Sequence, residues 1–220
     1  MIEEYLKVPA STILLSASQT IYMVAVSLIA GALLGIILAI ILVLTRPRGL
    51  FQNNTFYFVL NTIVNIVRSV PFIILMVAIM PVTKFIIGTR IGTTAALIPL
   101  ICHIAPYLAR LFENSMLEVD EGIIEAAQSM GATTSQVIWY FMMPEARSSL
   151  ILALTTGTIG LLGATAMAGA IGAGGVGNLA LTYGYERLNM PLMIATVVIL
   201  IIIVQLIQSF GNVVAQRFRH

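Results

Sequence analysis

The sequence predicts an all-α integral membrane protein with five membrane-spanning helices, and three observations support this fold class. Hydrophobic residues make up 59% of the 220 residues and charged residues only 9%, whereas a soluble domain carries about 25% charged residues. Several apolar runs reach the roughly 20 residues that a helix needs to cross the hydrocarbon core. With the exception of Arg68, the basic residues fall between these runs, as expected of loops at a membrane surface.

The five spans are expected at about residues 20–44, 55–80, 91–110, 148–169 and 190–211. The first belongs to a charge-free stretch that is too long for a signal-peptide core, so we expect it to be retained. The second is interpreted as one long, kinked helix, because Pro71 and Pro81 bracket its outer half. Glycines end the fourth span near Ala170. The chain, residues 1–220, is therefore expected to form a single transmembrane domain with a charged loop at 112–147.

The distribution of lysine and arginine predicts the orientation, since basic residues are enriched in cytoplasmic loops. Five spans place alternate loops on opposite sides of the membrane. One side receives six basic residues and the other receives four: Arg46, Arg48, Arg110, Arg147, Arg217 and Arg219 against Lys7, Lys84, Arg90 and Arg187. We therefore expect the N-terminus outside, and both the C-terminus and the loop 112–147 in the cytoplasm.

The cytoplasmic loop holds six of the nine acidic residues, which indicates an element that faces water. It is predicted to contain two short helices. The first covers about 121–130, with Asp120 as its N-cap and Gly131 in the left-handed conformation after its end. The second starts near 133–135 and is expected to end at Pro144. The pair is either a helical hairpin packed under the bundle or a docking surface on which Glu125 meets a cationic partner.

The loop contains Glu125-Ala126-Ala127, then three residues, Gly131, nine residues and Phe141-Met142-Met143-Pro144. This stretch resembles the EAA loop of bacterial ABC importer permeases, whose pattern is E-A-A-x3-G-x9-I-x-L-P. Phe141 and Met143 depart from the pattern but remain apolar. The resemblance implies that residues 125–131 form a coupling helix, which docks into a groove on a separate ATP-hydrolysing subunit. The residues implied in coupling are Glu125, Ala126, Ala127, Gly131 and Pro144.

Three further segments are most similar to the permease subunits of methionine importers: "RSVPFIILM" (68–76), "GTTAALIPLICHIAPYLAR" (92–110) and "AGAIGAGGVGNLALTYGYERL" (168–188). The resemblance implies a type I ABC importer permease in a bacterial inner membrane. The implied partners are a second copy of the chain, two cytoplasmic subunits that bind ATP and Mg, and an extracytoplasmic substrate-binding lipoprotein. The implied solute is L- or D-methionine, with another amino acid or small solute as the alternative.

Polar residues within the spans are candidates for the translocation path. Asn61, Asn65 and Arg68 are spaced i, i+4 and i+7, so they share one face of the second span. They either line a polar path or bond to neighbouring helices. Thr158 and Met167 on the fourth span likewise lie among small and hydroxyl residues that serve either the path or close helix packing.

The segment 172–177 also matches G-x-G-x-x-G, the spacing of a dinucleotide-binding turn. That fold needs a preceding strand and an acidic residue about twenty positions later, whereas Glu186 follows Gly177 by only nine. We therefore interpret the glycines as a turn at the outer end of the fourth span: Gly172, Gly174, Gly175 and Gly177.

The sequence contains no evident catalytic set, metal-ligand cluster or P-loop lysine motif. No cofactor is therefore expected in this chain, and a net charge of +2 gives no reason to expect nucleic acid. Two other functions remain: an autonomous channel or ion-coupled transporter, which moves solute without ATP, and a membrane enzyme, for which no acid–base pair is visible.

Overall fold

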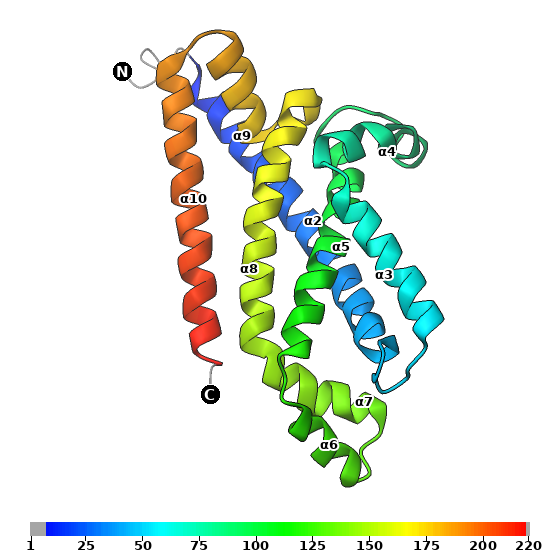
Figure 1. The fold of residues 1–220 in the computed structure, drawn as a ribbon. Coiled ribbons are helices and arrows are strands. Elements are labelled where there is room, and N and C mark those ends of the chain that lie inside the picture. The colour runs from blue at the N-terminus through cyan, green and yellow to red at the C-terminus, as the bar shows by residue number, and fades with distance from the viewer. Residues whose placement is uncertain (1–7, 219–220) are drawn as a thin grey trace.

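The structure is a computed structural model that describes residues 8–218, and it is built from helices throughout this range. Four long helices run along the molecule: α2 (Ala10–Thr45), α5 (Thr93–Leu117), α8 (Met143–Ala168) and α10 (Met190–Gln216). Short helices extend the bundle at one end, and a glycine-containing segment closes the other (Figure 1). Lys7 and Arg219, which entered the prediction of orientation, lie outside the described residues.

Helix α2 is longer than the predicted span, because it starts directly after Pro9 and includes the serine-containing residues before 20. It packs closely along α5. A methyl group added at Gly35 would lie 3.1 Å from the carbonyl oxygen of Ala105 and 3.0 Å from Leu108 Cβ, and Gly31 meets Ile104 in the same way. Small residues at this spacing let two helices approach without a side chain between them.

The expectation of one long helix at 55–80 is wrong in form, because the chain divides into α3 (Asn54–Ser69) and α4 (Phe72–Ile87), bent by 108°. Pro71 explains the break. Its ring disfavours helical backbone at the preceding residue, and Val70 is extended at φ −81°, ψ 123°. Within residues 8–218, four helices are long and apolar enough to cross a membrane, and the bent pair, if it forms one span, makes a fifth.

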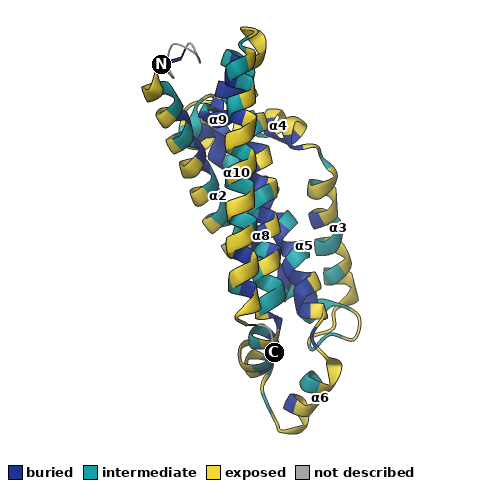
Figure 2. Ribbon diagram, turned by 90° about the vertical axis from the view of Figure 1, so that its left-hand side faces the viewer, coloured by how far each residue is buried: buried dark blue, intermediate teal, exposed yellow. Residues whose placement is uncertain are grey.

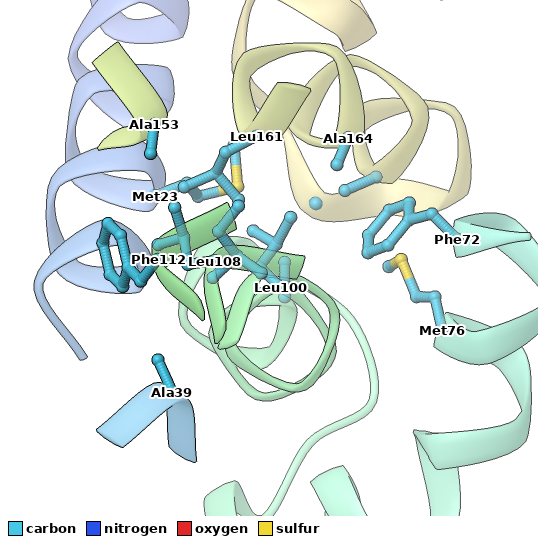
Figure 3. Packing of buried hydrophobic residues seen from close by; sticks show 14 residues of the cluster. Met23, Ala39, Phe72, Met76, Leu100, Leu108, Phe112, Ala153, Leu161 and Ala164 are labelled. Carbon is cyan, nitrogen blue, oxygen red and sulfur yellow. The ribbon is translucent and has the colours of Figure 1, made fainter. Parts of the chain in front are cut away.

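The core lies where α5 meets α2, α4 and α8 (Figure 3). Leu100, Ile104 and Leu108 of α5 are fully buried there, and Phe72 and Met76 reach it from α4. Helix α5 runs past the predicted end at 110 and carries the chain directly into the charged segment that was expected as a loop at 112–147. Exposed residues dominate the outer faces of α2 and α10, as expected of surfaces that face lipid (Figure 2).

The second half of the chain starts with α6 (Glu121–Ser129), α7 (Thr134–Gln136) and the π-helical turn η1 (Val137–Met142), which leads into α8. After α8 come the turn η2 (Gly169–Ala173), the single turn α9 (Gly175–Asn178) and the π-helical segment η3 (Leu179–Glu186). Ile171 and Gly172 have non-helical backbone within η2, so the regular helix ends where the glycines predicted.

Candidate functional site

The short helix α6 projects beyond the ends of α5 and α8 and is capped at both ends (Figure 1). The carboxylate of Asp120 accepts a hydrogen bond of 2.7 Å from the Gly122 N–H, which confirms the predicted N-cap. At the other end Gly131 has φ +81°, and the Ala132 N–H donates to the Ala127 carbonyl at 3.1 Å. A helix end leaves backbone N–H or C=O groups without a hydrogen-bond partner, and these contacts supply partners at both ends. The nine-residue helix is therefore well defined.

Helix α6 has two different faces. Ala127 is fully buried, and Ile124 packs against a cluster of apolar residues from α2, α5, the turn after α5 and the η1–α8 segment: Val43, Met116, Val119, Met142 and Ala146. Glu125 and Ala126 are exposed. A cavity of about 360 Å³ separates this helix from the loop after α2, and Glu125, Arg46 and Arg48 are among its lining residues. The helix is packed under the bundle and also presents a carboxylate and a methyl group outward.

The predicted second helix does not end at Pro144. Thr133 and Gln136 form a reciprocal capping box that starts it, as expected, but the chain then continues through η1 into α8. Pro144 sits in the first turn of α8, directly after the π-helical turn. The longer i→i+5 bonds of that turn leave room for the proline ring, which would otherwise clash with a carbonyl one turn earlier. The segments α7, η1 and α8 therefore form one continuous rod.

The three polar residues of α3 lie together against α5. Arg110 of α5 donates to the side-chain oxygens of both Asn61 and Asn65, the latter at 3.1 Å, and forms a 2.6 Å ion pair with Glu113. Arg68 stacks over the Tyr107 ring at 5.9 Å. These contacts favour the interpretation in which Asn61 and Asn65 bond to a neighbouring helix.

Sequence reasoning missed the partners in this cluster, Arg110 and Glu113. Glu113 is only 2% exposed, and Arg46, Arg68 and Arg110 are all close enough to interact with it electrostatically. A buried charge is tolerated only with such partners. The sequence feature that could have indicated this ion pair is the i, i+3 spacing of an arginine and a glutamate at the end of an apolar span.

One face of α8 has no partner within the described residues. Thr156, Gly160, Gly163 and Met167 are exposed at helical spacing, and a methyl group added at Gly163 would meet nothing within 4 Å. The nearby Thr158 hydroxyl donates to the Leu154 carbonyl of its own helix at 2.8 Å, and Met167 is 51% exposed. This face combines small, hydroxyl and flexible apolar side chains.

The glycine turn is braced against other helices at the end opposite α6. Gly172, Gly174 and Gly175 have φ of +90°, +79° and +82°. The Gly175 N–H donates to Gln19 Oε1 and the Val176 N–H to Thr20 Oγ1, both at 2.8 Å. Gly177 lies against the backbone of Ala166. Sequence reasoning did not predict that Gln19 and Thr20 hold this turn. Two polar side chains next to each other in an apolar helix were the feature that indicated such a role.

The surroundings of this turn do not match a dinucleotide site. A helix precedes it, and within residues 8–218 no strand is present to form a βα unit. Thr93 of α5 donates to the Ala173 carbonyl at 3.0 Å, so the turn instead ties α2, α5 and α8 together. Across these same residues no group of three or more metal-binding side chains comes together.

Comparison with known families and proteins gives one consistent result. Residues 31–220 match the family described as binding-protein-dependent transport system inner membrane component. The probable D-methionine transport system permease protein MetI of Vibrio cholerae is 48% identical over 211 residues, covering 96% of this chain and 94% of that one. The methionine import system permease protein MetP of Bacillus subtilis is 45% identical over 174 residues, covering 79% and 78%.

Solved structures agree with the sequence comparisons. A chain of the inward-facing MetNI methionine ABC transporter, from a selenomethionine-soaked crystal form, superposes with a TM-score of 0.94 at 39% identity and covers 96% of this chain and 98% of that one. A chain of an amino acid ABC transporter with histidines has a TM-score of 0.77 at 19% identity and covers 94% of each chain. The second likeness concerns the fold alone.

Proposed function

The chain belongs to the family of binding-protein-dependent transport system inner membrane components, and we propose that it is the membrane-spanning subunit of an ATP-driven methionine importer. Methionine is the solute printed for the relatives from Vibrio cholerae and Bacillus subtilis and for the MetNI transporter. The proposed solute is L-methionine, D-methionine or both. Since these relatives match most of the chain, the likeness extends well beyond the loop that carries the EAA pattern.

The single observation that carries the role in coupling is the geometry of α6. A capped helix at the end of the bundle exposes Glu125 and Ala126, while Ala127 anchors it from behind. Ala126 lets another surface approach closely, and Glu125 offers a charge to a cationic side chain. We propose that α6 docks into a groove on a separate ATP-hydrolysing subunit, which binds ATP and Mg, and that Gly131 and Pro144 hold the helix in its orientation.

The unpartnered face of α8 supports an assembly of two permease chains. Five spans are few for enclosing a solute path, and a two-fold axis perpendicular to the membrane would bring two such faces together. We place the path along this face, with Thr158 and Met167 at its margin. The N-terminus is proposed to lie outside, where a substrate-binding lipoprotein delivers the solute near the glycine turn.

The proposed cycle follows from this arrangement. ATP binding closes the two ATPase subunits and moves the two α6 helices toward each other. Because α7, η1 and α8 are continuous, that displacement reaches the face that lines the path and changes an inward-open bundle into an outward-open one. Hydrolysis then resets the assembly.

The test is uptake by proteoliposomes that contain this permease, its ATPase subunits and its binding protein. Radiolabelled L- and D-methionine are measured with internal ATP, with a non-hydrolysable ATP analogue and with neither. We expect accumulation only with hydrolysable ATP. Equal flux without ATP or without the ATPase would instead support an autonomous channel or ion-coupled transporter.

The identity of the solute is tested by competition in the same vesicles. Unlabelled methionine should abolish uptake, whereas leucine and histidine at the same concentration should leave it unchanged. ATP-dependent uptake that another amino acid competes away equally well would retain the importer but reject methionine as its specific solute.

A further inference from the structure

An apolar groove lies between α2 and α8 in the half of the bundle nearest α6. It has a volume of about 490 Å³. Ile29 and Leu33 of α2, at 64% and 60% exposure, line it together with Leu150 and Leu154 of α8. Such exposed apolar side chains within membrane helices indicate that the groove opens toward lipid.

Arg147 is the only polar side chain among the described residues that line this groove. Its Nε donates to the Pro144 carbonyl at 2.7 Å, and its guanidinium stacks over the Phe218 ring at 5.4 Å. These contacts fix the side chain, while its two terminal nitrogens make no hydrogen bond or ion pair with any described residue. A planar guanidinium held in this way, with donors to spare, suits a phosphate group.

The dimensions and polarity of the groove match one leaflet of a bilayer. Its lining on α8 extends from Met143 to Leu154, about 16 Å along the helix axis. Half of the roughly 30 Å hydrocarbon core is about 15 Å. The charge lies one turn from Met143, in the part of the groove nearest α6, where the predicted orientation places the cytoplasmic surface. From Arg147 the lining on α8 continues to Leu154, about 10 Å into the membrane, which fits within one leaflet.

We propose that this groove binds an anionic phospholipid of the inner leaflet, with one acyl chain between α2 and α8 and its phosphate on Arg147. Charge complementarity selects the headgroup, and the apolar lining accepts the chain. The proposal depends on the membrane topology but not on which solute is transported. Because α8 carries the cytoplasmic helices, a lipid at this position contacts the segment through which coupling is proposed to act.

The test uses the intact complex of permease and ATPase subunits in phosphatidylcholine nanodiscs. A minor fraction of the lipid is phosphatidylglycerol with a diazirine on one acyl chain, and a phosphatidylcholine analogue with the same chain serves as the comparison. After irradiation, labelled peptides are mapped by mass spectrometry. We expect the phosphatidylglycerol probe to label 29–36 and 150–154 about tenfold more than the phosphatidylcholine probe, the ratio typical of one charge-assisted hydrogen bond.

Two variants separate the headgroup from the acyl chain. Arg147→Gln should reduce labelling by phosphatidylglycerol to the level of phosphatidylcholine, whereas Arg217→Gln, at a cation outside the groove lining, should leave the ratio unchanged. Ala32→Phe fills the groove and should remove labelling by both probes. Leu34→Phe is its matched control, because Leu34 is exposed on α2 but does not line the groove.

The proposal is overturned by equal labelling with both probes in the wild-type complex, or by labelling that Ala32→Phe leaves intact. It is also overturned if Leu33→Cys and Leu150→Cys crosslink between two permease copies, since a second copy would then occupy the groove. The wild-type maps decide the question even if a variant fails to fold. Loss of methionine uptake with the labelling intact would reject the proposed function and not this site.

Discussion

The two ends of the bundle both depend on glycines with positive φ, but for different reasons. At Gly131, next to α6, a methyl group would meet nothing within 4 Å, so only the backbone conformation requires glycine. At Gly175, in the opposite turn, a methyl group would lie 2.7 Å from Thr20 Oγ1 and 2.9 Å from Met23 Cε. The glycine turn needs the absence of a side chain as well as the left-handed backbone.

This difference distinguishes α6, which we propose as a docking element, from the glycine turn, which is a structural joint. The glycine turn is enclosed by α2 and α5, and two of its backbone N–H groups donate to Gln19 and Thr20. The α6 end is open on one face and is held by caps, while the cluster of Arg110 and Glu113 secures α3 beside it. Substitutions in the glycine turn, and in the buried Arg110–Glu113 pair that secures α3, should therefore lower stability. Substitutions that change only the exposed α6 or its caps should lower transport more than stability.

The largest effect is expected from Arg110→Met, which tests how far the open end depends on buried charge. The change leaves the Glu113 carboxylate without its ion-pair partner, and a buried charge left unpaired costs about 3–5 kcal/mol. We expect about 3 kcal/mol, since Arg46 and Arg68 still act on Glu113. The unfolding midpoint of the purified chain in detergent measures this, and adding Glu113→Leu should recover part of the loss.

The next largest loss of stability, about 2–3 kcal/mol, is expected from Gly175→Val, because the change adds left-handed strain and overpacking. The measurement is the amount of monodisperse protein that survives a heating series before size-exclusion chromatography. Gly163→Ala is the control, because that position is open and lacks a positive φ. If Gly175→Val were as stable as this control, the glycine turn would not be the constrained joint described above.

Gly131→Val should cost only the left-handed strain, about 1–2 kcal/mol, and yet abolish most ATP-dependent uptake. Strain at this position changes the course of the chain from α6 to α7, so the helix no longer fits its proposed partner. Membrane insertion should be normal. Gly131→Asn should retain part of the uptake, since asparagine tolerates this conformation; wild-type uptake by the valine variant would argue against coupling through α6.

Thr20→Val should have the smallest effect. It removes the hydroxyl that accepts from the Val176 N–H and keeps the shape of the side chain. Hydrogen bonds between membrane helices contribute about 0.6–2 kcal/mol, so we expect a loss near 1 kcal/mol in thermal unfolding and unchanged uptake at low temperature. A loss of uptake without a loss of stability would indicate that the glycine turn moves during transport and is not a rigid joint.

The sequence predicted best the features that depend on local chemistry. The N-cap at Asp120, the left-handed Gly131 and the start of the helix at Thr133 were all found at the expected residues. Each depends on one side chain or one φ value, and neighbouring residues suffice to recognise it. The long apolar helices were also expected, although α2 and α5 extend beyond their predicted ends.

The features that were missed depend on contacts between distant segments. A proline at 71 indicates a kink, but the 108° bend is also shaped by the packing of Phe72 and Met76 in the core. Asn61 is 49 residues from Arg110, so spacing along one helix showed a polar face without showing its partner. Proline within an apolar run predicts a helix end, whereas the π-helical turn that accommodates Pro144 has no simple sequence signature.

The helical segment from Thr134 to Ala168 is continuous, so a rotation at one end moves the other end with it. Helix α8 has 26 residues and is therefore about 39 Å long. In the proposed cycle, a tilt of about 10° at the end of α8 next to α6 moves its far end by about 7 Å, comparable to the width of an amino acid side chain. A small angular displacement at α6 would thus become a passage-sized movement beside the glycine turn without any change within the helix.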